Sequence, residues 1–251
     1  TANTAGGSSG DINVMSGNTT AAGRSGDVTM STGNAQDAAG SVLLSVGSSG
    51  GIEQGGSVGI VAGSSAGQVG GSVAIQSGIG GAGAASGSVK IQTPGHELTK
   101  DSGDVSIVTG NSTTGQAGSL RLSVGSGLAG SQVGELTLSA GASAHDAGGS
   151  VSIRSGHSTG GAGGQVVVAA GNSVRSDGGS IVARTGSSST QGGNIVLSSG
   201  GSSASSSGTV AIESADGQTG SGTVHLASGR GQLGSSGDVK LSSGDAVDGA
   251  S

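Results

Sequence analysis

The chain has 251 residues, of which 58 are glycine, with one proline, no cysteine, no aromatic residue and a formal net charge of −6. Only 31% of the residues are apolar, which excludes an ordinary globular core, because such cores draw much of their buried area from aromatic residues and leucine. Nine basic residues spread thinly along an acidic chain argue against nucleic acid as a partner. No apolar stretch has the length of a signal peptide or a membrane span.

One unit, Gly-Ser/Asp-Val-x-Ile/Leu-x-Ser/Thr-Gly, recurs sixteen times at intervals of 14 to 16 residues. We number its residues one to eight and call them the frame; the six to eight residues between successive frames form an arc. Such a fixed period indicates a repeat architecture, and we expect a single array over residues 1–251. Since neither end carries a capping copy, we expect the array to be a segment of a longer chain. The frames begin at Gly10, Gly26, Gly40, Gly56, Gly71, Gly87, Gly103, Gly118, Gly134, Gly149, Gly164, Gly179, Gly193, Gly208, Gly222 and Gly237.

Apolar residues recur at positions three and five of the frame, as in Val73 and Ile75, and a small residue such as Ser77 stands at position seven. Side chains alternate across an extended strand, so these three positions share one face. Polar residues such as Lys90 and Arg154 stand at positions four and six, on the opposite face. Each frame therefore predicts one half-buried strand of about five to seven residues.

The arcs decide how these strands connect. They contain no second run of alternating apolar residues and are longer than the two to five residues of a usual hairpin loop. Their length suits a crossing between two sheets packed about 10 Å apart. We therefore predict an all-β fold, a repeat β-solenoid of sixteen short strands in two parallel sheets with about two copies per rung. A solenoid with one copy per rung and an antiparallel meander are the alternatives. In each, the glycines at positions one and eight mark backbone turns where φ can be positive.

The residues that usually carry chemistry are scattered. The histidines His96, His145 and His157 fall in arcs, and His225 falls in a frame. This scatter predicts no enzyme, no catalytic residue, no metal site and no cofactor, because such sites need convergent ligands. Four frames carry aspartate at position two, which we interpret as a solvated face rather than a calcium site; they are Asp11, Asp27, Asp104 and Asp238.

Two sequons occupy the same place, directly after the glycine at position eight. They are Asn18-Thr19-Thr20 and Asn111-Ser112-Thr113. Exposed turns suit glycan attachment in a secreted protein, so Asn18 and Asn111 are the candidate N-glycosylation sites. The Ser/Thr-rich arcs are equally suited to O-linked sugars.

Frames such as 102–112 and 149–156 resemble repeats in large secreted Ser/Gly-rich proteins of diatoms and related algae. The resemblance covers nearly the whole chain. It implies an extracellular surface, wall or appendage protein with a mechanical or adhesive role, and it supplies no catalytic residues.

We therefore expect an extracellular structural protein, a β-solenoid building block of a filament, sheath, wall or cell-surface appendage. Its expected partners are further copies or neighbouring repeats of the same protein, and glycans. An ice-binding solenoid is the first alternative, although position four varies from Asn13 to Lys90 and Val167 and so matches a lattice poorly. A carbohydrate-binding adhesin stalk is the second, although sugar platforms usually need aromatic rings.

Overall fold

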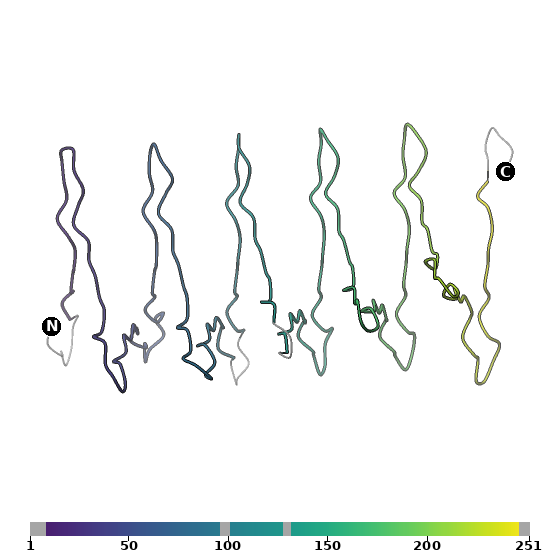
Figure 1. Ribbon diagram of the computed structural model, residues 1–251, viewed down its shortest axis with the longest axis horizontal. Coiled ribbons are helices and arrows are strands. Elements are labelled where there is room, and N and C mark those ends of the chain that lie inside the picture. The colour runs from purple at the N-terminus through teal and green to yellow at the C-terminus, as the bar shows by residue number, and fades with distance from the viewer. Residues whose placement is uncertain (1–8, 96–100, 128–131, 246–251) are drawn as a thin grey trace. The chain divides into compact units, whose positions relative to one another are not determined.

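A computed structural model describes residues 9–95, 101–127 and 132–245 (Figure 1). These residues contain no helix and no β-strand; they consist of extended stretches, bends and one tight turn. The chain divides into two units, Thr1–Ser123 and Val124–Ser251. Within each unit the same local arrangement recurs, because an extended frame alternates with a bent arc in every described copy.

The predicted β-solenoid is therefore wrong. No frame in the described ranges pairs with another frame through a strand ladder, so there is neither a sheet nor a stack of rungs. The half-buried strands predicted for the frames are also absent, since no side chain in those ranges is buried. The chain keeps the extended backbone that the alternating pattern favours, but nothing covers its apolar face.

The solvent-accessible surface measures how far the chain is from a closed core. It amounts to 24836 Å² for 22.8 kDa. A folded monomer of this mass exposes about 9,600 Å² and a fully unfolded chain about 33,000 Å². The value lies nearer the unfolded limit, since it corresponds to burial of about a third of the surface that a folded domain of this mass removes from water.

The composition explains this outcome. Each copy of 14 to 16 residues brings only two regular apolar anchors, while the chain must order 58 glycines. Glycine loses more conformational freedom on ordering than any other residue. Two Val or Ile side chains per copy do not offset that loss unless other surfaces cover them, and among the described residues these side chains are exposed.

The arcs also differ from the prediction, because they close on themselves instead of crossing between sheets. At the tenth copy, the backbone N–H of Gly164 donates to the carbonyl oxygen of Gly156 at 2.9 Å. The donor is position one of a frame and the acceptor is position eight of the frame before it. Seven described arcs close in this way, at 2.8–3.0 Å, with donors Gly71, Gly87, Gly149, Gly164, Gly179, Gly193 and Gly208.

Positive φ angles lie inside arcs and not at the positions expected from the pattern. Gly83 has φ of +81° and follows Ala82 in a turn that is closed by the Ala84 N–H donating to the Gly81 carbonyl at 3.0 Å. Such a φ at the third residue is the signature of a type II turn and favours glycine there. No described glycine at position one or eight has a positive φ, so glycine serves another purpose at those positions.

Candidate functional site

At most described arcs the glycine at position one lies close to the residue at position seven of the preceding frame. A Cβ added to Gly164 would lie 3.1 Å from the Cβ of Ser155 and 3.1 Å from the backbone nitrogen of Gly156. Ser155 is the small residue at position seven of the preceding frame. Where Val46 occupies position seven, a Cβ on Gly56 would overlap its Cγ1. The residue at position seven and the glycine at position one therefore contact each other, and the contact favours a small residue at both positions.

The same contact recurs at junction after junction of the described copies. At the junctions named below, the nearest atom of the residue at position seven would lie 3.0 to 3.7 Å from a new Cβ, except at Gly56, where it would lie closer. Distances above 3.4 Å are ordinary van der Waals contacts. At the last described junction, Gly237, a new Cβ would meet nothing within 4 Å. Position eight is different, because a Cβ there would meet nothing within 4 Å at any described copy. The junctions lie at Gly26, Gly40, Gly56, Gly71, Gly87, Gly103, Gly118, Gly134, Gly149, Gly164, Gly179, Gly193, Gly208 and Gly222.

Threonine at position seven adds a second bond to some of these junctions. The Thr32 hydroxyl donates to the carbonyl oxygen of Gly40, and the Thr185 hydroxyl donates to that of Gly193, both at 3.1 Å. In each case the acceptor is the glycine at position one of the next frame. The arc between Gly186 and Gly193 thus has two hydrogen bonds at its base, because the Gly193 N–H also donates to the carbonyl oxygen of Gly186.

A serine two residues after position eight organises the interior of the arc; we call it the arc serine. In the arc after the tenth frame it is Ser158, whose Oγ accepts from the N–H of Gly161 at 2.9 Å. Six arc serines accept from the N–H three residues later, at 2.9–3.0 Å. Such turns let a serine hydroxyl replace a backbone acceptor. The six are Ser65, Ser112, Ser143, Ser158, Ser173 and Ser202.

The sequence analysis did not single out the arc serines. Their signal is nevertheless present, since Gly-x-Ser recurs at the same place in copy after copy, as at 141–143, 156–158 and 171–173.

The large apolar side chains of the described residues are all exposed, and the exposure follows the frame. The large apolar residues at position three, from Val28 to Val239, are 51–60% exposed. Those at position five are 61–99% exposed. Apolar residues in arcs, such as Ile52 and Leu233, are fully exposed. The frame therefore presents a regular apolar face in every copy, and the arcs present isolated apolar residues without a period.

The area of this face is large. Burying a Val, Leu or Ile side chain contributes about 1.5–3 kcal/mol, which at about 25 cal/mol per Å² corresponds to about 60–120 Å². Positions three and five hold 31 large apolar side chains, each more than half exposed. Half of each area gives about 900–1,900 Å² per chain still open to water. A standard protein interface buries about 800 Å² on each partner.

Charge is divided unevenly between frames and arcs. The frames hold six carboxylates and five basic groups, so their formal charge is −1. The arcs hold nine carboxylates and four basic groups, so their formal charge is −5. The two values sum to the −6 of the whole chain. Within the last frame, Lys240 and Asp238 form an exposed ion pair at 3.6 Å. The apolar face thus belongs to segments that are nearly neutral.

Both candidate glycosylation residues, Asn18 and Asn111, lie exposed on arcs. The neighbouring Ser112 is an arc serine that accepts from the N–H of Gly115 at 2.9 Å. The sequon hydroxyl at Thr113 is also exposed. The structure therefore places both asparagines where an enzyme can reach them.

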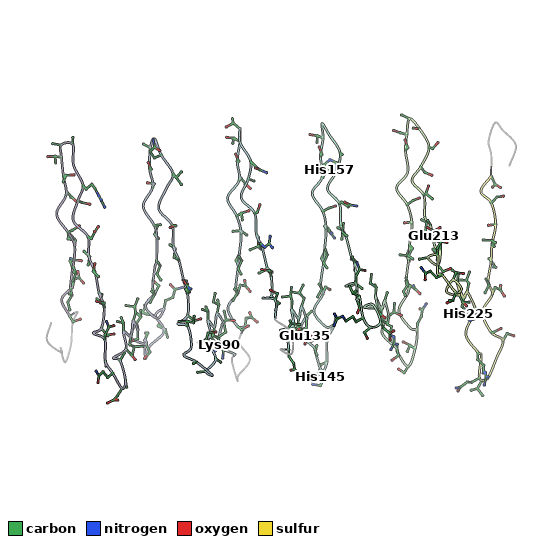
Figure 2. All side chains as sticks on the ribbon, in the orientation of Figure 1. Lys90, Glu135, His145, His157, Glu213 and His225 are labelled. Atoms are coloured by element: carbon green, nitrogen blue, oxygen red, sulfur yellow. The ribbon has the colours of Figure 1, made fainter. Side chains whose placement is uncertain are left out.

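The remaining chemistry-bearing side chains do not converge within the described ranges. His145 and His157 lie on arcs and His225 lies in a frame (Figure 2), while His96 falls outside the described residues. No group of three or more His, Asp or Glu side chains gathers in the described part, and that part contains no cavity. No helix that could cross a bilayer occurs among the residues 9–95, 101–127 and 132–245.

Comparisons with protein-family models, with curated protein sequences and with solved structures find no match to this chain.

Proposed function

We propose that this chain is a structural protein that works by associating with further copies of itself, as a building block of an extracellular filament, sheath, wall or cell-surface appendage. One observation carries the proposal. Every large apolar side chain of the described residues is exposed, and those at positions three and five repeat in each copy.

Exposed apolar side chains that repeat in copy after copy favour an interaction site, because apolar surface left in water is stabilised when another surface covers it. The face recurs in sixteen copies at intervals of 14 to 16 residues. A repeated face suits a partner that is itself repetitive, and the chain is such a partner. Regular arrays in repeat proteins gain stability from neighbours rather than from a central core.

The extracellular assignment rests on the arcs. Asn18 and Asn111 are exposed residues in sequons, and the arcs are rich in Ser and Thr. Glycans on arcs would surround an assembly with sugar without covering the frames. Protein isolated from its source cells tests this part of the proposal: the intact mass should fall after enzymatic removal of N-glycans, and peptide mapping should assign the loss to both asparagines. Unmodified asparagines in material recovered from inside the cells would overturn the extracellular assignment.

Self-association is tested by sedimentation velocity over a wide range of protein concentration, together with electron microscopy of the concentrated material. We expect the mean sedimentation coefficient to rise with concentration and elongated assemblies to be visible at the upper end. A chain that stays monomeric at high concentration, and shows no assemblies by microscopy, would refute the structural role.

A further inference from the structure

We propose that copies of this chain associate through the frames and that the arcs stay in water at the outside of the assembly. The inference rests on the proposed function and goes further, because it names which surface of the chain is covered and which is not. Its occupant is a second copy of the same chain. Three observations on the described residues support it.

The first observation is the area. Summed over all the frames, about 900–1,900 Å² of apolar side-chain surface is open per chain, spread over sixteen repeated segments. In the arcs, apolar residues such as Ile52, Ile79 and Val174 are even more exposed, at 97–102%, but they stand alone and without a period. Only the frames therefore present large apolar side chains at a regular period.

The second observation is the charge. Frames with a formal charge of −1 can approach one another closely, whereas arcs with a formal charge of −5 repel. Carboxylates gather at position two and basic groups at positions four and six, as in Asp238 and Lys240. Both signs are therefore available to a partner copy along the frame.

The third observation is the backbone. The arcs satisfy part of their own hydrogen-bonding capacity through the arc serine and the closing bond, as between Gly164 and Gly156. The frames in the described ranges have no backbone ladder. Unpaired backbone N–H and C=O groups along an extended segment are a template for contact with another chain. The arcs are already partly closed in the single chain, and the frames are not.

A pair of matched variants tests the inference. The frame variant carries Val151→Ser, Ile153→Ser, Val166→Ser and Val168→Ser, all at positions three and five. The arc variant carries Ile52→Ser, Ile79→Ser, Val174→Ser and Leu233→Ser, which removes side chains that are at least as exposed. Since no side chain of the described residues is buried, neither variant acts by unfolding a core.

The measurement is the protein concentration at which half of the chain sediments as assembly. We expect the frame variant to raise this concentration by about tenfold or more and the arc variant by less than about twofold, because only the frame residues lose burial. An arc variant that weakens assembly as much as the frame variant would overturn the inference and leave the structural role standing. A wild-type chain that never assembles would overturn both.

Hydrogen–deuterium exchange on assembled wild-type protein provides an independent readout. Peptides that cover frames, such as 149–156, should be slowed by assembly much more than peptides that cover arcs, such as 157–163. Equal slowing of the two kinds of peptide would contradict the placement of arcs in water.

Discussion

Replacing the glycine at position one should open an arc, whereas replacing the glycine at position eight should not. In the tenth arc, a Cβ on Gly164 would lie 3.1 Å from the Ser155 Cβ, 3.1 Å from the Gly156 nitrogen and 3.4 Å from the Gly156 oxygen. These atoms belong to backbone or to a short side chain, so the backbone itself has to shift by a few tenths of an ångström to admit the Cβ. The matched control is Gly156→Ala, since a Cβ at Gly156 would meet nothing within 4 Å.

The magnitude follows from the bond that the contact supports. Gly164→Ala should weaken or break the 2.9 Å bond from the residue 164 N–H to the Gly156 carbonyl. A backbone hydrogen bond contributes about 0.5–1.5 kcal/mol net, so the ratio of open to closed arc should rise about 2- to 13-fold. Gly156→Ala should have the opposite sign, because it restricts the open arc and favours closure by about 0.4–1 kcal/mol.

The assay is amide hydrogen exchange of residue 164, measured by NMR at a concentration low enough to keep the chain monomeric and corrected for the intrinsic rates of Ala and Gly. We expect faster exchange in Gly164→Ala and unchanged or slower exchange in Gly156→Ala. Equal exchange in both variants would show that the contact between positions seven and one does not hold the arc closed. Slower exchange in Gly164→Ala would refute the steric argument.

Three further outcomes are expected from the same chain. Ser158→Ala should remove the acceptor for the Gly161 N–H at 2.9 Å and raise that amide's exchange rate about fivefold, for a loss of about 1 kcal/mol, and Ser158→Thr should restore protection. Gly83→Ala should destabilise the type II turn by about 1–2 kcal/mol, because φ at this residue is +81°. The measurement is the temperature coefficient of the Ala84 amide chemical shift, which should become steeper as the hydrogen bond to Gly81 weakens. An unchanged coefficient would count against the turn. Raising the ionic strength from about 0.01 M to about 0.1 M shortens the Debye length from about 30 to about 10 Å, so repulsion between acidic arcs should fall and association measured by sedimentation should increase. Weaker association at higher salt would instead indicate that attraction between opposite charges dominates.

Part of the arc geometry could be foreseen from the sequence. The glycines at positions one and eight were predicted to bound an extended segment, with the small residue at seven on its apolar face, and the described frames run as extended traces (Figure 1). The purpose of the glycine at one was not foreseen, because Ser155 and Gly164 are far apart along the chain and meet only when the arc closes. The recurrence of Ser158 and its equivalents could have been read as a turn signal.

The architecture could not be foreseen in this way. The alternation of Val73 and Ile75 with polar residues predicts which side chains share a face, and it was interpreted as evidence that the face is buried. In the structure these two side chains remain 53% and 69% exposed. A pattern of apolar residues identifies a surface that water disfavours, but it does not identify what covers that surface.

The sequence by itself determined the local features of this protein: the period of the copies, the extended frames, the positions of the arcs and the division of charge between them. These depend on residues that are neighbours along the chain. The structure alone shows that seven described arcs close through a backbone hydrogen bond and that the frames of the described residues form no strand ladder with one another. Those outcomes depend on a balance in which two apolar anchors per copy face the ordering of many glycines, and that balance favours exposed frames until another surface covers them.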